Sequence, residues 1–282
     1  MRAPSQRSHS AAAKAASLGK DEGELWRRVI AGENPASIAG RGAGPRAPTH
    51  VTLAVVFQVR DGALQVLMWQ RGREPFKRQW ALPGGYLEPD ETLEASIRRH
   101  LAAKVDVREV AHLEQLETRS DPARNPRGRE LATAYLGLIP AGLDPEVPDD
   151  TAWHPVGSLP PAAFDHGEIV DAALQRLRAK LSYTNIGFAL APAEFTLSEL
   201  RTVYVAALGR DVSATNLQRV LLRRRVLERT GAKREPGKTG GRPADLFRFR
   251  SPVLEVTDPF AVLRPRPSAS GVAGGARPEG TV

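Results

Sequence analysis

The chain has 282 residues, of which 41% are hydrophobic and 26% are charged, and it contains no cysteine. This size and composition fit a soluble protein of one or two domains, and the lack of cysteine excludes disulfide bonds, thiolate catalysis and a cysteine-based zinc site. No apolar run of about eighteen residues occurs, and residues 1–16 lack the apolar core of a signal peptide. We therefore expect a cytoplasmic protein with no membrane partner.

The formal net charge of +8 is concentrated in one part of the chain. Residues 182–250 carry 13 basic and 6 acidic side chains, whereas residues 49–181 carry 16 basic and 19 acidic ones. A basic module joined to a slightly acidic one is typical of a nucleic-acid-binding protein. The charge pattern therefore predicts that the second module binds nucleic acid, and it favours a nucleoid-associated position in the cytoplasm.

We divide the chain into four parts by composition. Residues 1–48 are rich in Ala, Ser, Gly, Arg and Pro and are predicted to be a disordered basic extension. Residues 49–181 are predicted to form an effector-binding domain and residues 182–250 a DNA-binding domain. Residues 251–282 are predicted to be a tail that is largely disordered.

The first domain begins with two predicted strands, at 51–59 and 63–69. Between them lies Asp61-Gly62, a pair that favours a two-residue hairpin turn. Further predicted elements are a helix at 91–104, strands at 110–116 and 131–139, and a helix at 168–181. Strands and helices mixed around one apolar core indicate an α/β or α+β domain with a mixed sheet.

The second domain begins with the sequence F-T-L-S-E-L, in which Thr196 caps a helix and Glu199 completes a capping box. Gly209 ends this helix, and Ser213 begins a second, basic helix that runs to about residue 225. Two short β-rich runs, at 226–227 and 246–249, then flank a basic loop rich in Gly and Pro. Two helices followed by a hairpin with a basic tip are typical of a winged helix-turn-helix domain.

A motif in the first domain resembles the Nudix box, G-x5-E-x7-R-E-U-x-E-E-x-G-U, in which U is a bulky aliphatic residue. Gly85, Glu91 and Arg99 match the first half of the box. The stretches Q-W-A-L-P-G-G-Y-L-E, N-P-R-G-R-E-L-A-T-A-Y-L-G-L and A-W-H-P-V-G-S-L-P also resemble the family, in the same order along the chain. This resemblance covers about residues 51–181 and implies a Nudix fold.

The second half of the box lacks the glutamates that the family has there. Those positions hold His100, Ala103 and Lys104. Three carboxylates at i, i+3 and i+4 share one side of a helix and can hold a cation such as Mg²⁺, which activates water for pyrophosphate hydrolysis. None of the three residues present offers an anionic oxygen, and Lys104 repels a divalent ion. We therefore expect no metal, no cofactor, no catalytic residues and no enzymatic activity.

The same domain is instead predicted to bind a nucleotide effector. Gly84 and Gly85 allow a phosphate to approach the backbone at the start of a helix, while nearby basic and aromatic side chains suit a diphosphate and a base. Tyr86 is a further aromatic candidate. The predicted effector-binding residues are Arg71, Phe76, Lys77, Trp80, Gly84, Gly85, Arg99 and Lys104. The alternative is a Nudix fold retained as a structural or dimerisation block.

The predicted recognition helix spans residues 213–225, with Leu217, Val220 and Leu221 facing the core. Asn or Gln can pair with adenine and Arg with guanine in the major groove, while other basic side chains on the helix and wing bind phosphates. The predicted DNA-binding residues are Thr215, Asn216, Gln218, Arg219, Arg223, Arg224, Lys238 and Arg242. A solvated basic helix, or a winged helix that contacts proteins, is the alternative.

Together the two halves resemble the Nudix-related transcriptional regulators of bacterial NAD metabolism, the NrtR family. The matching stretches are F-K-x2-W-A-L-P-G-G at 76–85, F-T-L-x-E-L-x2-V-Y at 195–204 and G-R-P-A at 241–244. The resemblance implies a homodimeric repressor of NAD biosynthesis or salvage genes whose affinity for a double-stranded DNA operator changes with ADP-ribose or a related nucleotide.

Two alternatives remain open at the level of sequence. One is an active ADP-ribose pyrophosphatase with a metal site rebuilt from Glu88, Glu91 or Glu94. The other is a Nudix-like regulator that responds to a sugar. The long extension at 1–48 departs from the family pattern.

Overall fold

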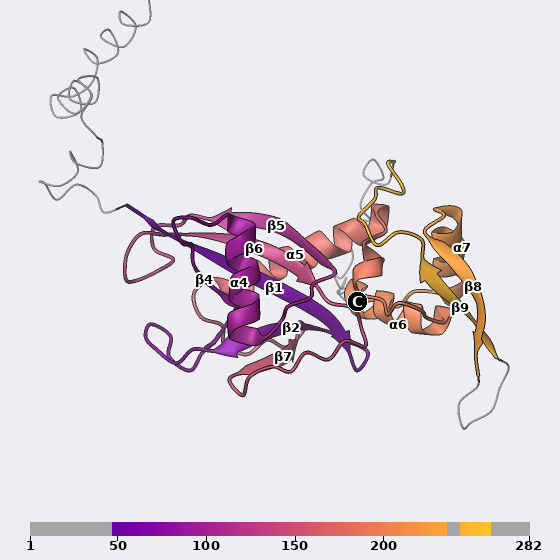
Figure 1. The fold of residues 1–282 in the computed structure, drawn as a ribbon, viewed down its shortest axis with the longest axis horizontal. Coiled ribbons are helices and arrows are strands. Elements are labelled where there is room, and N and C mark those ends of the chain that lie inside the picture. The colour runs from indigo at the N-terminus through magenta and orange to yellow at the C-terminus, as the bar shows by residue number, and fades with distance from the viewer. Residues whose placement is uncertain (1–46, 236–242, 261–282) are drawn as a thin grey trace, which may run out of the picture. The chain divides into compact units, whose positions relative to one another are not determined.

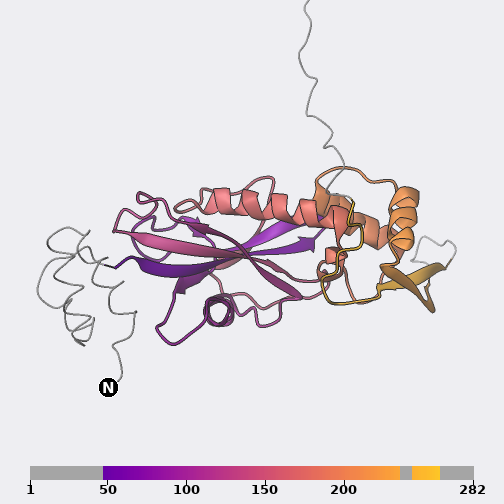
Figure 2. The same cartoon turned by 90° about the horizontal axis from the view of Figure 1, so that it is seen from above.

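The computed structural model describes residues 47–235 and 243–260. A seven-stranded mixed sheet carries a helix on each face and is followed by a smaller helical part with a two-stranded sheet (Figure 1). Seen from above, the longest helix runs along one face of the large sheet and continues to the smaller part (Figure 2). The predicted mixed-sheet domain followed by a winged helix is confirmed.

The large sheet is built around β1 (Thr49–Arg60), which pairs antiparallel with β2 (Ala63–Gln70) and parallel with β6 (Glu130–Leu138). Asp61 and Gly62 form the expected turn with φ of 50° and 76°. The other strands are β3 (Trp80–Ala81), β4 (Gly84–Tyr86), β5 (His112–Arg119) and β7 (Thr151–Pro155). The four predicted strands are confirmed, whereas β3, β4 and β7 lie in segments for which no strand was predicted.

Both faces of the sheet are covered, so β1 is buried continuously from residue 51 to residue 59. On one face lies α4 (Leu93–Val105), which contributes Ile97 and Leu101 to the core. On the other face lies α5 (His166–Tyr183), which contributes Ile169, Val170, Ala173 and Leu177. Both helices were predicted, and α5 begins two residues earlier than expected.

The smaller part contains the helices α6 (Leu197–Leu208) and α7 (Ala214–Arg223) and the hairpin of β8 (Leu227–Arg234) and β9 (Ala244–Phe249). The capping box forms as predicted: Thr196 Oγ1 accepts from the Glu199 backbone N–H, and the Glu199 carboxylate accepts from the Thr196 N–H. Phe195 pairs with Phe247 through two backbone hydrogen bonds, which adds a short third strand to the hairpin.

The apolar core of the winged helix is continuous with the core on the α5 face of the sheet. A short 3-10 helix, η1 (Ile186–Ala189), follows α5 and leads into the smaller part. Residues 251–260 were predicted to belong to a disordered tail, but they lie against the end of α5. Asn185 bonds to Val253 and Glu255, and the backbone N–H of Thr257 donates to the Tyr183 carbonyl. This part of the tail therefore has a fixed structure.

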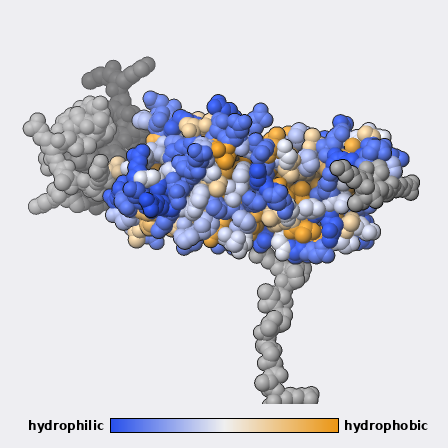
Figure 3. Space-filling view, turned by 90° about the horizontal axis from the view of Figure 1, so that it is seen from below, coloured by the Kyte–Doolittle hydropathy of each residue, from blue (hydrophilic) through white to orange (hydrophobic). Residues whose placement is uncertain are grey.

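The surface of the described part is mainly polar. Figure 3 shows one face on which hydrophilic residues dominate and hydrophobic ones are scattered among them. None of the helices in residues 47–235 and 243–260 has both the length and the apolar character that a membrane span requires. Tyr86, which is 63% exposed, is among the large hydrophobic side chains that remain accessible.

Candidate functional site

A cavity of about 450 Å³ lies beside β4 and α4, and its volume falls within the usual range for small-molecule sites. Its walls come from the segment after β2, the glycine-rich β4, one face of α4, and the loops that precede β6 and α5. Its charged lining residues are Arg71, Arg73, Arg99, Lys104, Arg124 and Arg127 together with Glu74, Glu88 and Glu130.

Lys104 occupies a position at which the Nudix box has a glutamate. Its Nζ donates to the Gly84 carbonyl at 2.5 Å and lies 4.8 Å from the centre of the Trp69 ring. Burial lowers the pKa of Lys104, and the neighbouring charges of Arg71 and Arg73 lower it further. The ammonium therefore sits in a partly dry site among other cations, where an anion would relieve the repulsion.

His100 occupies a second former glutamate position and also contacts a carbonyl of β4. Its Nε2 lies 3.0 Å from the Tyr86 carbonyl, and burial is the main cause that lowers the pKa of the ring. A Cβ atom on Gly85 would lie 2.5 Å from His100 Cε1, and one on Gly84 would lie 2.0 Å from the Thr52 carbonyl. Glycine is therefore required at position 84, where β4 passes the backbone of β1, and a side chain at position 85 would displace the His100 ring.

The acidic residues near this helix are engaged by arginines. Arg99 donates to both oxygens of Glu91, at 2.5 and 2.9 Å, and these hydrogen bonds lower the pKa of Glu91 to about 2. Glu94 pairs with Arg98, and Glu88 lies 3.4 Å from Arg99. In the part of the chain that the structure describes, no cluster of three His, Asp or Glu side chains could hold a metal ion. The donor set at α4 therefore does not fit a divalent cation.

The cavity has more cations than carboxylates can neutralise. Within residues 47–235 and 243–260, Arg71, Arg73, Lys104 and Arg127 form no ion pair with a carboxylate. Burial is the largest cause that lowers the pKa of Arg71, and the charge of Arg127 is the next. Cations that depress one another's pKa make a site that favours an anionic ligand.

Arg124 is buried between two carboxylates on one side of the cavity. It donates to Glu130 Oε1 at 2.6 Å and to the two oxygens of Asp165 at 2.7 and 3.3 Å. Burial alone would raise the pKa of Asp165, but the hydrogen bonds and charge of Arg124 outweigh it and hold that pKa below its usual value. Next to this network, the ring of Phe164 lies 4.7 Å from the guanidinium carbon of Arg71.

His166 is the first residue of α5 and is 3% exposed. Its Nδ1 accepts a hydrogen bond from the Leu82 backbone N–H at 2.9 Å. Burial lowers the pKa of His166 to about 3, so the ring is neutral at physiological pH. The imidazole therefore ties the start of α5 to the strand segment that leads into Gly84 and Gly85.

Five of the eight predicted effector-binding residues line the cavity: Arg71, Gly84, Gly85, Arg99 and Lys104. The prediction differs from the structure at the other three. The ring centre of Phe76 lies 4.8 Å from that of Phe164, Trp80 packs against His154 at 4.2 Å, and Lys77 is exposed. The loop after β2 folds back through a hydrogen bond from Arg71 Nε to the Pro75 carbonyl, a path that spacing alone does not reveal.

The sequence prediction missed several residues that line the cavity. They are Arg73, Arg124, Arg127, His100 and Phe164, whereas Tyr86 was considered as one of three aromatic candidates. The basic run R-N-P-R-G-R at 124–129 could have indicated that this segment contributes cations to an anion-binding site. However, the partner of this run is the start of α5, some forty residues away, and only the fold brings the two together.

The outer face of α7 carries Thr215, Asn216, Arg219 and Arg223, all of them exposed, with Gln218 half-buried beside them. Arg219 Nη2 donates to Asn216 Oδ1 at 2.9 Å, which aligns two of the predicted base-reading side chains. The opposite face holds Leu217 and Leu221, buried as predicted, and Val220, which is half-buried.

Arg224 was grouped with these residues but lies on another side. It donates to Thr257 Oγ1 at 2.8 Å and to the Leu181 and Thr184 carbonyls, so it joins the end of α7 to the end of α5. On the wing, Arg234 pairs with Glu199 and Lys233 is exposed. The predicted contacts Lys238 and Arg242 lie outside the described residues.

A pH titration tests the neutral state of His166. An unfolded histidine titrates near pH 6.5, so the unfolded state gains a proton before the folded state does, and stability falls as the pH drops from about 6.5 toward about 3. This group contributes a slope of about 1.4 kcal/mol per pH unit. Replacing it in a His166→Gln variant should make the free energy of unfolding fall less steeply between about pH 6.5 and 4.5. Urea unfolding at several pH values measures the slope of the free energy of unfolding against pH for the wild type and the variant. Equal slopes in the two proteins would contradict the assignment.

Comparisons with known proteins agree with this architecture. A family model for the NrtR DNA-binding winged helix domain matches residues 187–249, and one for the NUDIX domain matches residues 48–173. The chain is 33% identical over 218 residues to the ADPR responsive transcriptional repressor NtrR of Acinetobacter baylyi, a match that covers 75% of this chain and 86% of the relative.

Two further comparisons bear on the domains. An ADP-ribose pyrophosphatase of Methanocaldococcus jannaschii is 31% identical over 120 residues, which cover 39% of this chain and 68% of the relative. The crystal structure of Shewanella oneidensis NrtR in complex with a 27mer DNA matches with 33% identity and a TM-score of 0.61, over 72% of this chain and 93% of that one. The chain therefore belongs to the NrtR family, in which a Nudix domain is joined to a DNA-binding winged helix.

Proposed function

We propose that this protein is a transcriptional repressor of NAD biosynthesis or salvage genes that binds ADP-ribose, or a related NAD-derived nucleotide, without hydrolysing it. The observation that carries the proposal is the ammonium of Lys104, which lies at a former glutamate position in a cavity with surplus cations. The names of the relatives support it: one is a repressor that responds to ADPR, and another was crystallised with DNA.

The cavity chemistry suits a diphosphate. Gly84 and Gly85 line the cavity, and Lys104 donates from α4 to the Gly84 carbonyl of the same strand. Arg71 and Arg127 add positive charge from the facing loops. A hydrogen bond between charged groups contributes about 1.5–3 kcal/mol, so a few of them account for micromolar binding.

Three aromatic side chains line the cavity in the described part of the chain, and of these Tyr86 is exposed, whereas Trp69 and Phe164 are half-buried. Tyr86 lines the cavity and is 63% exposed, so its ring is free to stack on adenine. The other two aromatic candidates, Phe76 and Trp80, are engaged by Phe164 and His154. We therefore assign base recognition to Tyr86.

Hydrolysis by the Nudix route requires a water activated by a cation that carboxylates hold on α4. His100 and Lys104 present nitrogen donors there, already bonded to the Tyr86 and Gly84 carbonyls. The nearby Glu91 is neutralised by Arg99. The bound nucleotide therefore stays intact and acts as a signal.

The winged helix binds the operator DNA in this proposal. We place α7 in the major groove, where Asn216 and Arg219 reach base edges and Arg223 reaches a phosphate. A homodimer would set two such helices about 34–36 Å apart on a palindromic operator. Ligand and DNA would each weaken the binding of the other by the same factor.

The effector claim is tested with DNA from the promoter next to the protein's own gene. Saturating ADP-ribose should weaken wild-type binding to this DNA. A Lys104→Met variant keeps the apolar stem on Trp69 but loses the charge, so its affinity for ADP-ribose should fall about 10- to 100-fold. Calorimetry and a fluorescence-anisotropy titration measure the two affinities.

The matched control for that experiment is Arg98→Met, which removes an exposed charge from the same helix. It should bind ADP-ribose as the wild type does. Wild-type DNA affinity that is identical with and without ADP-ribose would falsify the sensing claim. Release of AMP from ADP-ribose in the presence of Mg²⁺ would favour the pyrophosphatase instead.

The DNA-binding face has its own test. Replacing Arg219 and Arg223 with alanine should weaken promoter binding about 100-fold, since each contact to a base or phosphate contributes about 1–3 kcal/mol. Both side chains are exposed, so thermal stability and ADP-ribose affinity should not change. An Arg210→Ala variant, also exposed but off this helix, is the control. An unchanged gel shift by the double variant would rule out α7 as the recognition helix.

A further inference from the structure

α5 is the element that reaches both functional parts of the molecule. It has 18 residues, which corresponds to about 27 Å of helix. Phe164 and His166, at its start, line the cavity beside β4. Its far end meets the winged helix, as the view from above shows (Figure 2). A movement at one end of this helix is therefore passed to the other end.

The N-cap residue of α5 forms an ion pair instead of a capping hydrogen bond. Asp165 occupies the N-cap position, where an aspartate typically accepts a hydrogen bond from the first turn, but its side chain makes no such bond. Its carboxylate is turned to Arg124, which donates two hydrogen bonds to it. Asp165 does not itself line the cavity, whereas Arg124 does. The position of the helix start thus depends on a residue of the pocket wall.

Arg124 donates hydrogen bonds to two carboxylates, so an additional anionic acceptor would compete with them for its guanidinium. Its side chain is 2% exposed and binds both Glu130 and Asp165. The second oxygen of Glu130 is already held by Asn125 Nδ2 at 3.0 Å, which fixes that carboxylate in place. A phosphate in the cavity adds an anionic acceptor for the same guanidinium, and buried ion pairs respond strongly to the loss of a partner. Of the hydrogen bonds that Arg124 donates, those to Asp165 are therefore the ones that a bound phosphate would replace.

The far end of α5 is bonded to both helices of the winged helix. Arg178 Nε donates to the carbonyl of Ala207, in the last turn of α6. Arg224, which follows α7, donates to the Leu181 and Thr184 carbonyls. The end of α5 therefore sets where α6 and the recognition helix lie.

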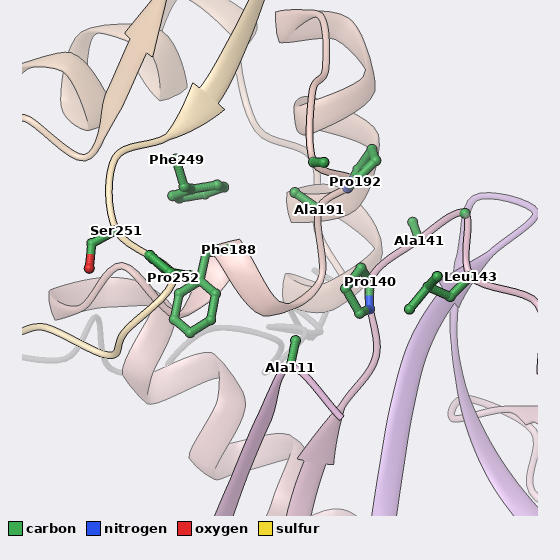
Figure 4. Close-up of a pocket in the computed structure, with 12 residues that line it drawn as sticks. Ala111, Pro140, Ala141, Leu143, Phe188, Ala191, Pro192, Phe249, Ser251 and Pro252 are labelled. Carbon is green, nitrogen blue, oxygen red and sulfur yellow. The ribbon is translucent and has the colours of Figure 1, made fainter. Parts of the chain in front are cut away.

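On another side of the junction the two parts are separated by an apolar cavity of about 640 Å³ (Figure 4). Pro140 and Leu143 line it from the Nudix side, and Phe188 and Phe249 line it from the winged-helix side. Protein interiors are otherwise close-packed, so this space leaves room for the winged helix to shift. The contacts at the end of α5 are then the ones that fix the position of the winged helix.

We infer that Asp165 is a positioning residue that couples nucleotide binding to DNA binding, through its ion pair with Arg124 at one end of α5 and the contacts of Arg178 at the other. This inference rests on the proposed function, because it describes how the same pocket acts on the winged helix. It makes Asp165 necessary for communication between the two sites and dispensable for either binding event.

The test compares the affinity of the full-length protein for ADP-ribose with and without saturating promoter DNA. The ratio of the two dissociation constants is the coupling factor. An Asp165→Asn variant keeps the size of the side chain but loses its charge and one of the two oxygens that accept hydrogen bonds from Arg124. Its coupling factor should approach one, and its affinity for DNA alone should stay within about threefold of the wild type. Its affinity for ADP-ribose alone should not fall, because Asp165 no longer competes with the phosphate for Arg124. A merely structural role would weaken both affinities instead.

The control is Glu168→Gln, which removes another carboxylate from the first turn of α5. Glu168 is exposed and pairs with Arg119 on the surface, so this variant should keep the wild-type coupling factor. An Arg178→Gln variant acts at the opposite end, outside the cavity lining, and should lose coupling as Asp165→Asn does. Either of these two loss variants suffices if the other does not fold.

Hydrogen exchange on the wild type adds a measurement that needs no variant. ADP-ribose should change amide protection near residue 165 and also in the last turn of α5. Changes confined to the cavity would overturn the inference. So would a folded Asp165→Asn variant with full coupling, while the proposed function would stand. A wild-type coupling factor of one would overturn both.

Discussion

The molecule depends on a positive charge placed where its fold family places negative ones. The Lys104 ammonium reaches across from α4 to the Gly84 carbonyl, and His100 makes the same kind of bond to Tyr86 one turn earlier. The helix and the glycine-rich strand are thus joined by side chains of the chain itself. A cation is still present at this place, but it is covalently part of the protein and carries no water to activate.

This substitution changes what the cavity can do without changing the fold. The glycines, the Glu91–Arg99 pair and the helix remain, so the shape of the site is kept. The charge balance, however, is reversed, and Arg71 and Lys104 are left without carboxylate partners in the described part of the chain. Under the proposed function, such a cavity binds an anion and releases it unchanged. In the coupling that we infer, the long helix α5 connects binding in this cavity to the position of α7.

Much of the architecture could be predicted from local signals. The Asp61-Gly62 turn, the capping box at Thr196 and Glu199 and the Gly209 stop each act over a few residues, and each forms as expected. The cavity wall was harder because it depends on contacts between distant segments. Nothing in the spacing shows that Arg124 meets Asp165, or that Arg224 turns away from the DNA-binding face. The spacing also does not show that Phe76 and Trp80, two of the three aromatic candidates, pack against Phe164 and His154.

The most direct test of the central claim is a calorimetric titration of ADP-ribose into the full-length protein, once with excess EDTA and once with millimolar Mg²⁺. If Lys104 and the arginines provide the charge that holds the diphosphate, the two dissociation constants will agree within about twofold, and the nucleotide recovered afterwards will be intact. Binding that requires Mg²⁺, accompanied by conversion of ADP-ribose to AMP, would contradict the account.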